Sequence, residues 1–205
     1  MSVPRPRPGS PPAAPEGRLP PGQAPTRKWP VLHYGEVPRF DAATWDFQVY
    51  GEVEEELRFG WEEWRALPTE ERAGDIHCVT GWSRLDNRWR GVPVRELLRR
   101  ARPRPGARFV LLRAAGGWTA NLPLEDFDRD DNLFATHHDG EPLPPEHGGP
   151  VRAVIPHLYF WKSAKWLRAV ELLAADRPGF WERGGYHMRG DPWKSERFGD
   201  PLPDD

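Results

Sequence analysis

A single cysteine, Cys78, occurs in the 205-residue sequence. One cysteine excludes an internal disulfide, and it also excludes zinc and iron–sulfur sites that need several cysteines. The sequence contains no C-x-x-C-H segment to which a c-type haem could be attached. Any one-electron step in the chemistry of this chain would therefore need a separate electron carrier.

The sequence also lacks long apolar runs and a charge of one sign. No stretch of about 18 apolar residues occurs, and the amino terminus has neither an apolar core of signal-peptide length nor a twin arginine. The 29 basic and 31 acidic residues give a formal charge of −2, so no broad positive surface is offered to nucleic acid or to an anionic membrane. We expect a soluble, cytoplasmic, monomeric protein without a membrane span or a nucleic-acid partner, in which any anion site is local.

Proline and tryptophan are abundant instead, with 25 and 11 copies. Prolines interrupt long helices, whereas many aromatic rings let short strands and loops bury a large area. The length suits one sizeable domain. These features predict a single α+β domain with a strand-rich mixed sheet and short helices.

The two ends of the chain differ in composition. Residues 1–28 are rich in proline, glycine, alanine and arginine without a periodic apolar pattern, which predicts an extended or disordered arm. An arm that wraps the domain is the alternative. We expect the folded domain to span residues 29–205, because apolar and aromatic residues begin at Trp29 and the tail is too rich in aromatics for a solvated terminus.

Local patterns predict short elements along the domain. Alternating apolar residues indicate strands, and apolar residues at helical spacing near prolines indicate short helices. Acidic stretches without such a pattern are expected to be solvated loops, although the carboxylates of residues 125–131 could also bind a hard cation. The expected strands cover residues 45–49, 57–59, 109–113, 118–122 and 151–155 and one that ends at Ile76; the helices cover 61–67 and 93–101; the acidic loops cover 69–75 and 125–131.

The segment from Ile76 to Leu98, IHCVTGWSRLDNRWRGVPVRELL, surrounds the cysteine. Cys78 should leave a strand and enter a polar turn at residues 80–83, where its side chain can reach a pocket. A lone cysteine can also be a small buried apolar residue. The segment resembles the molybdenum-cysteine segment of the sulfite oxidase superfamily, and most closely its bacterial protein-methionine-sulfoxide reductase branch, in the order of Cys78-Val79, Trp82-Ser83, Trp89, Gly91, Pro93 and Leu97-Leu98.

A second block, DGEPLPPEHGGPVRAVIPHLYFWKSAKWLRAVEL at residues 139–172, resembles the same superfamily in its proline loop, its glycine-proline-valine-arginine run and its aromatic-lysine-x-x-lysine turn. Arginine forks and lysine charges suit a phosphomonoester, although surface lysines and a structural ion pair are the plainer interpretation. Residues 163–174 have helical apolar spacing, but the superfamily turn leads into a strand, and we expect a strand. Carried over position by position, the resemblance implies that the pterin and its phosphate are held by His147, Arg152, Lys162, Ser163 and Lys165, and by His33 and Tyr34 of the HYGEVP segment.

The resemblance implies an oxidoreductase that holds molybdenum and molybdopterin and transfers an oxygen atom, with the Cys78 thiolate as a metal ligand. Soft thiolate donors suit such a metal. Trp82 stands soon after the cysteine, where sulfite-oxidising members carry an arginine, so a neutral S- or N-oxide is expected as the small-molecule substrate in preference to sulfite. In the aromatic tail, Tyr186, His187 and Trp193 are expected to approach the metal, unless the tail only closes the core.

The chain has no room for the cytochrome and dimerisation domains of animal sulfite oxidases, which implies a separate one-electron donor or acceptor protein. The methionine-sulfoxide reductase branch is exported, whereas no export signal is visible here. A non-enzymatic binding module that keeps the fold is the alternative function, with the arm and the tryptophans as its partner surface. A zinc site lacks the spacing of known ligand sets, which would here have to come from His137, His138, His147 and His157.

Overall fold

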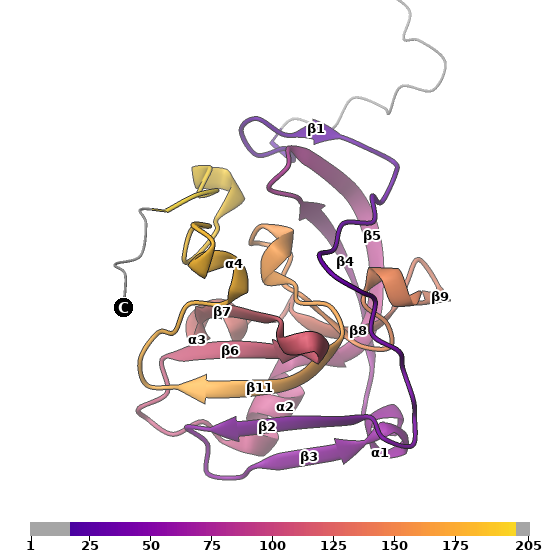
Figure 1. Ribbon diagram of the computed structural model, residues 1–205, viewed down its shortest axis with the longest axis vertical. Coiled ribbons are helices and arrows are strands. Elements are labelled where there is room, and N and C mark those ends of the chain that lie inside the picture. Colours follow the sequence, from indigo (N-terminus) through magenta and orange to yellow (C-terminus); the bar gives the residue numbers. More distant parts are fainter. Residues whose placement is uncertain (1–16, 200–205) are drawn as a thin grey trace, which may run out of the picture.

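The computed structural model describes residues 17–199, in which two β-sheets and short helices form one layered body (Figure 1). The first sheet has the order β1-β5-β8-β10, with β4 paired to β5 and β9 paired to β8, and the second has the order β3-β2-β11-β6-β7. Each sheet contains one parallel pair, β1 with β5 and β2 with β11, beside antiparallel pairs. The predicted strand-rich, mixed α+β fold is confirmed.

The helices are short, as the proline content predicts. The strands of the first sheet are β1 (Ala24–Pro25), β4 (Glu70–His77), β5 (Trp82–Pro93), β8 (Leu133–His138), β9 (Glu141–Pro142) and β10 (Arg152–Val154). Those of the second are β2 (Asp46–Gly51), β3 (Leu57–Gly60), β6 (Phe109–Ala114), β7 (Thr119–Pro123) and β11 (Leu167–Leu173). The helices are α1 (Trp61–Arg65), α2 (Val94–Ala101), α3 (Leu124–Phe127) and α4 (Phe180–Arg183), with 3₁₀ turns η1 (Ala115–Gly117), η2 (Pro145–His147), η3 (Phe160–Lys162) and η4 (Pro192–Lys194).

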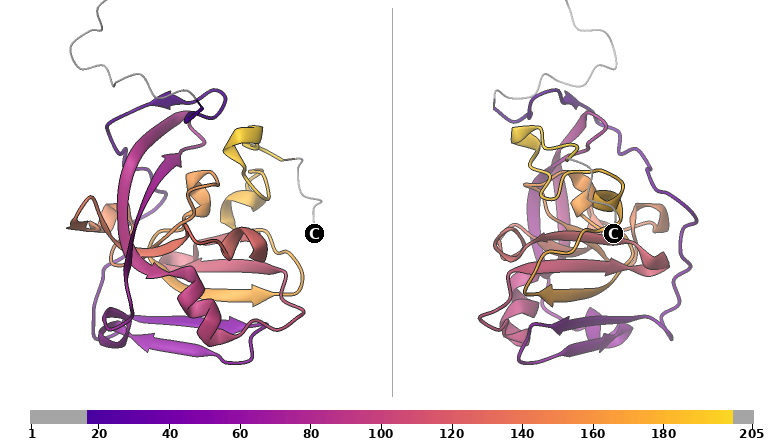
Figure 2. Two further views of the ribbon diagram at one scale, coloured as in Figure 1. Left: turned by 180° about the vertical axis from the view of Figure 1, so that it is seen from behind. Right: turned by 60° about the vertical axis from the view of Figure 1, so that its left-hand side comes forward.

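Strands β4 and β5 form a long curved hairpin that carries the cysteine loop at one end and leads into α2 at the other (Figure 2). The predicted acidic loop at residues 69–75 is therefore wrong, because Glu70 already begins β4, whose charged side chains face solvent along a paired backbone. The predicted turn at 80–83 is also shorter, since Trp82 begins β5. Where β5 crosses β8, a Cβ atom on Gly91 would lie 2.1 Å from the Phe134 carbonyl oxygen, so only glycine fits.

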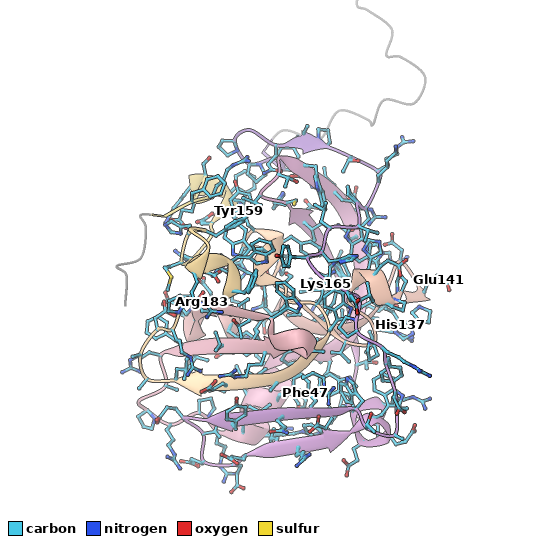
Figure 3. The ribbon with its side chains drawn as sticks, viewed as in Figure 1. Phe47, His137, Glu141, Tyr159, Lys165 and Arg183 are labelled. Atoms are coloured by element: carbon cyan, nitrogen blue, oxygen red, sulfur yellow. The ribbon has the colours of Figure 1, made fainter. Side chains whose placement is uncertain are left out.

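The main core lies between the second sheet and α2. Helix α2 forms where predicted because Val94, Leu97, Leu98 and Ala101 recur at helical spacing, and all four are buried. Phe47 of β2 belongs to the same cluster and lies low in the view of Figure 3, below Tyr159 and Lys165. The second sheet and α2 thus form the base on which the rest of the chain is built.

Strand β11 confirms the strand expected after the lysine turn. Its apolar residues have helical spacing, yet β11 pairs with β2 on one side and β6 on the other. Pairing on both edges satisfies the backbone of this strand, and Leu167, Val170 and Leu172 are buried in the core. Tertiary packing therefore overrides the local helical preference.

Both ends of the described chain pack on the domain. Residues 17–28 run along the hairpin, where Ala24–Pro25 pairs with the start of β5 and Arg18 donates to Asp75 (3.0 Å). The rest of the predicted arm, residues 1–16, lies outside the described residues. The tail carries α4, labelled in Figure 1, and η4, whose Trp193 packs edge-on against His77 of β4. None of the helices between residues 17 and 199 has the length and apolar character needed to span a bilayer.

The acidic stretch at 125–131 is a solvated loop only in part. It begins within α3, where Asp126 is buried and accepts two hydrogen bonds from Arg189 of the tail (2.7 and 2.9 Å). Burial alone would raise the pKa of Asp126, but hydrogen bonds and the Arg189 charge hold it far below its usual value. This ion pair fixes the tail against the domain.

Candidate active site

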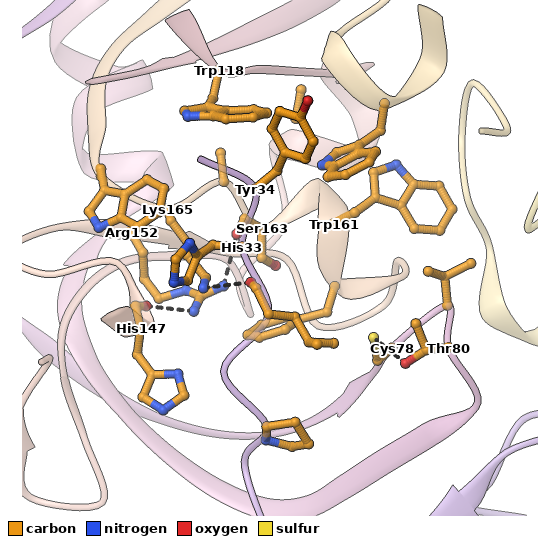
Figure 4. Close-up of a pocket in the computed structure, with 18 of the residues that line it drawn as sticks. His33, Tyr34, Cys78, Thr80, Trp118, His147, Arg152, Trp161, Ser163 and Lys165 are labelled. Atoms are coloured by element: carbon orange, nitrogen blue, oxygen red, sulfur yellow. Dashed lines mark hydrogen bonds between the residues drawn. The ribbon is translucent and has the colours of Figure 1, made fainter. Parts of the chain in front are cut away.

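A cavity of about 310 Å³ lies where the cysteine loop, residues 29–34, β7, η3 and α4 meet (Figure 4). Cys78 lies at one side of it, and Arg152 and Lys165 lie at the other. Among the described residues that line this cavity there is neither aspartate nor glutamate. The space therefore combines one thiol, a cationic region and walls that carry no negative charge.

The cysteine loop, residues 78–81, is a tight turn between β4 and β5. The Cys78 amide donates to the Trp82 carbonyl (2.8 Å), and the Gly81 amide donates back to the Cys78 carbonyl (3.0 Å). Gly81 adopts a φ of 97°, which favours glycine. The Cys78 side chain is only 9% exposed, and its Sγ lies 3.2 Å from the Thr80 hydroxyl. The thiol is thus held at the wall of the cavity with one hydrogen-bond partner.

Aromatic rings form much of the cavity wall. Trp118 stacks with Trp181 at 6.4 Å between centroids, and Trp161 meets Tyr186 edge-on at 5.2 Å. Trp82 lines the cavity beside the cysteine as predicted. These walls suit an uncharged ligand with an apolar surface.

The cationic region consists of Arg152 and Lys165. Arg152 is 1% exposed and donates to the carbonyl oxygens of His147 (2.7 Å) and Ser163 (2.9 Å). Lys165 donates to the carbonyl oxygens of Leu32 (2.8 Å) and Glu146 (2.7 Å). Within residues 17–199 neither cation forms a salt bridge, which leaves two charges without a carboxylate partner.

Burial shifts the protonation of this region. Desolvation and the neighbouring Arg152 charge lower the pKa of Lys165 to about 7. Desolvation, Lys165 and Arg152 together lower the pKa of His147 to about 4, so its imidazole is neutral at pH 7. A bound anion would stabilise the charged form of Lys165.

Unpaired polar atoms give a second indication of a ligand. His147 stacks on Trp29 at 3.8 Å, and its buried Nδ1 has no hydrogen-bond partner in the described structure. The buried hydroxyl of Thr119, on β7, also lacks one. Both residues line the cavity, and buried polar groups normally find partners. The donor set of cations, a neutral imidazole, a hydroxyl and a thiol fits a polar anionic cofactor that needs a soft metal ligand.

Three more of the predicted cofactor residues line the cavity. His33 and Tyr34 come from the irregular segment before β2, where Tyr34 packs edge-on against Trp118 at 5.7 Å. The Ser163 hydroxyl accepts from the Ile155 amide (2.9 Å) and still has its own hydrogen to donate. The fold thus brings His33, Tyr34, His147, Arg152, Ser163 and Lys165 to one space with Cys78 and Trp82.

Lys162 is not brought there. Its amine is completely buried on the far side of η3, where it pairs with Glu182 at 2.6 Å and donates to the carbonyl oxygens of Asn121 (2.7 Å) and Met188 (2.6 Å). Burial lowers its pKa, which the Glu182 carboxylate partly counteracts. Lys162 therefore ties α4 and β7 together and does not face a phosphate.

His187 also lies outside the cavity lining. Its Nδ1 accepts hydrogen bonds from the amides of Arg189 and Gly190 (both 3.1 Å), so the ring organises the turn that follows it. Tyr186 does reach the cavity, whereas Trp193 instead packs edge-on against His77 at 6.1 Å. Of these three tail residues, Tyr186 alone lines the cavity.

Two other cations that could place a positive charge near Cys78 form salt bridges outside the cavity. Arg84 pairs with Asp139 at 2.6 Å, and Arg189 pairs with Asp126. Neither lines the cavity. No group of three potential metal ligands among histidine, cysteine, aspartate and glutamate occurs in residues 17–199, so the histidine zinc site finds no support there.

Sequence reasoning missed several lining residues. Thr80 stands two positions after the cysteine, and that spacing could have identified it. Thr119 and Trp118 carry no local signal, because they reach the cavity only through the pairing of β7 with β6.

Comparison with known proteins points to one family. The pattern of the family described as "Oxidoreductase molybdopterin binding domain" matches residues 34–181. The uncharacterized oxidoreductase YuiH of Bacillus subtilis is 54% identical over 183 residues, which cover 89% of this chain and 92% of that protein. The putative protein-methionine-sulfoxide reductase subunit YedZ1 of Azospira oryzae is 28% identical over 168 residues, or 80% of this chain and 64% of that protein.

Two further relatives extend the comparison. The protein-methionine-sulfoxide reductase catalytic subunit MsrP of Campylobacter jejuni is 28% identical over 166 residues, 70% of this chain and 54% of that protein. This chain thus spans less than two thirds of the length of either reductase relative. The sulfane dehydrogenase SoxCD from Paracoccus pantotrophus shares the fold, with a TM-score of 0.65 and 21% identity over 75% of this chain and 43% of that one. Because the family pattern spans most of the described chain, the protein belongs to the molybdopterin-binding oxidoreductases of the sulfite oxidase superfamily.

Proposed function

We propose that this oxidoreductase transfers an oxygen atom at a molybdenum–molybdopterin cofactor, reducing a small neutral S- or N-oxide with electrons from a separate protein. The observation that carries the proposal is the placement of the only cysteine of the sequence at the wall of a cavity whose other side holds Arg152 and Lys165, two cations that form no salt bridge within residues 17–199. A thiol and an anion site on opposite sides of one space suit a cofactor with a metal at one end and a phosphate at the other.

Cys78 is the proposed metal ligand. A thiolate is a soft donor, and coordination keeps it deprotonated. The Thr80 hydroxyl, 3.2 Å from Sγ, can donate to the thiolate and so stabilise its negative charge. When bound, the cofactor would supply the oxygen-atom transfer, and the chain supplies the ligand, the anion site and the walls.

Arg152 and Lys165 are the proposed phosphate contacts. Both are oriented by backbone carbonyls, so their charges are preorganised before an anion arrives. His147 and the Ser163 hydroxyl add neutral hydrogen-bonding groups beside them. Charge-assisted hydrogen bonds from Arg152 and Lys165 to a phosphate would contribute about 1.5–3 kcal/mol each.

The walls near Cys78 favour an uncharged substrate. Burial of a dianion without a paired cation costs several kcal/mol, and both Arg84 and Arg189 are held by carboxylates outside the cavity. Aromatic rings can instead pack against the apolar groups of a sulfoxide or an N-oxide. Two relatives carry the name of methionine-sulfoxide reductase, which agrees with this substrate class.

A separate electron carrier is proposed on two grounds. The sequence has no motif for haem attachment and only one cysteine. Two relatives are named as subunits, which implies that they work with another chain.

A steady-state comparison tests the function. Purified protein from a molybdenum-replete host would be assayed with a dye electron donor against sulfoxides and N-oxides, and with a dye acceptor against sulfite. We expect reduction of the oxides and little oxidation of sulfite. Rapid sulfite oxidation at low concentration without oxide reduction would contradict the substrate assignment, and metal-loaded protein inactive in both directions would favour the non-enzymatic binding module.

A further inference from the structure

We infer that Gln23 and Arg197 are positioning residues that clamp the cysteine loop from the two ends of the chain. Both lie outside residues 34–181, the part that matches the family, so the clamp is a feature of this chain beyond the family domain. The inference deepens the proposed function, because it assigns a role to the two segments in orienting the proposed metal ligand.

Three of the four carbonyl oxygens in the loop 78–81 are held by these end segments. The Gln23 side-chain amide donates to the Cys78 carbonyl (3.1 Å), and the Ala24 amide of β1 donates to the Gly81 carbonyl (2.9 Å). The Arg197 guanidinium donates to the Val79 carbonyl (2.5 Å). The family domain itself contributes the turn hydrogen bonds between Cys78, Gly81 and Trp82 and the contact of Cys78 Sγ with the Thr80 hydroxyl.

The Gln23 amide is fixed at both of its ends. Its Oε1 accepts from the Ser83 hydroxyl (3.2 Å), and the Ser83 oxygen lies 2.8 Å from His77 Nδ1. Because the Ser83 hydrogen is used toward Gln23, His77 Nδ1 has to be the donor in its contact with Ser83. Ser83 and His77 are buried, so this chain of hydrogen bonds runs beneath the loop and leaves Gln23 one orientation.

Arg197 joins the tail, the arm and the loop. Besides the Val79 carbonyl it reaches the carbonyl of Gly22 (3.4 Å), and its guanidinium lies 5.6 Å from the centre of the Tyr159 ring. The Arg197 carbonyl in turn accepts from the His187 amide (3.2 Å). A single side chain thus connects three segments that lie far apart in the sequence.

The loop needs such support because of its own sequence. Gly81 has a positive φ and no side chain, and a four-residue turn that contains a glycine can adopt several conformations. A shift of the loop by a fraction of an ångström would change the direction in which Cys78 Sγ enters the cavity. The clamp holds one of these directions.

The first arm of the test uses the metal-free full-length protein. Backbone hydrogen exchange would be followed for the peptide that covers residues 76–84 in Gln23→Ala, Arg197→Ala and the wild type. Loss of a side-chain hydrogen bond to a loop carbonyl should speed exchange of the Gly81 amide by roughly tenfold. The matched controls are Gln48→Ala and Arg183→Ala, which lose contacts to Asp46 and Pro178 and should leave this peptide unchanged.

The second arm uses the metal-loaded protein and a readout that a loss of stability alone would not move. At equal molybdenum content, the electron paramagnetic resonance spectrum of the one-electron-reduced metal should show shifted or doubled g values in both clamp variants. Arg197→Lys keeps a cationic donor for the Val79 carbonyl and should restore the wild-type spectrum in large part. The control variants should give wild-type g values.

The two arms separate the clamp from the proposed function. Faster exchange at residues 76–84 with altered g values supports the clamp, and unchanged exchange in both variants overturns it. Altered g values in the controls as well would also overturn it, because the effect would then not come from the loop. Wild-type protein that contains no molybdenum would contradict the proposed function. The exchange measurement alone would then decide whether Gln23 and Arg197 hold the loop.

Discussion

Replacement of Lys165 by alanine is predicted to weaken cofactor binding without unfolding the domain. The Lys165 amine is one of only two cations in the cavity lining, and it is held by the carbonyl oxygens of Leu32 and Glu146 with no carboxylate partner in residues 17–199. Its removal leaves no buried negative charge unpaired. The loss should therefore fall on anion binding.

The magnitude follows from one charge-assisted contact. Such a contact contributes about 1.5–3 kcal/mol, which corresponds to a loss of affinity of roughly 10- to 150-fold. The pKa of Lys165 is lowered to about 7 in the cofactor-free protein, and binding of a phosphate requires the charged amine. The affinity of the wild type should therefore fall as pH rises through 7, and Lys165→Ala should lack this fall.

The assay is retention of the pterin through serial dilution and gel filtration, with the oxidised pterin quantified by its fluorescence at pH 6, 7 and 8. Lys194→Ala is the matched control, since the Lys194 side chain is 61% exposed, lies 4.0 Å from Asp191 and does not line the cavity. Lys165→Arg should retain most of the affinity. Retention equal to the wild type in Lys165→Ala, or equal losses in Lys194→Ala, would refute the assignment of Lys165 to the phosphate.

Three further predictions concern stability. In the cofactor-free protein the free energy of unfolding should rise between pH 7 and the ordinary lysine pKa of about 10.4. The reason is that the unfolded chain binds the Lys165 proton more tightly than the folded chain does. Urea unfolding at several pH values should show no such rise in Lys165→Met. Lys162→Met should destabilise the domain by about 3–5 kcal/mol, because Glu182 is left as an unpaired buried charge, and adding Glu182→Gln should recover much of that loss; a single variant as stable as the wild type would argue against the buried pair. Gly91→Ala should lower the free energy of unfolding by about 1–3 kcal/mol or more, because the new Cβ would meet the Phe134 carbonyl. Urea unfolding measures this loss, and a neutral effect would mean that β5 and β8 can separate freely.

The sequence predicted the fold class and most strand positions because apolar alternation and turn residues act locally. It failed at Glu70–Asp75, where charged residues occupy a strand. Pairing with β5 satisfies the backbone there, and the side chains of Glu70–Asp75 are exposed or half-buried, so no apolar alternation marks this part of the strand. The helical spacing of residues 163–174 was overridden only because the resemblance indicated a strand.

The site could be predicted as a set of residue types but not in full detail. Lys162 and Lys165 stand three residues apart in one turn, and no pattern tells which of them faces the cavity. The 3₁₀ turn η3 decides it by directing Lys162 toward Glu182. The same limit applies to Gln23 and Arg197, whose contacts with the cysteine loop span 55 and 118 residues of sequence.

The central claim is that Cys78 binds the metal of a molybdenum–pterin cofactor. Metal analysis combined with X-ray absorption at the molybdenum edge, on wild type and Cys78→Ser from a molybdenum-replete host, tests it most directly. We expect close to one molybdenum per wild-type chain, and one sulfur neighbour fewer around the metal in a folded, inactive Cys78→Ser protein. Wild-type protein without molybdenum, or the same sulfur count in both proteins, would contradict it.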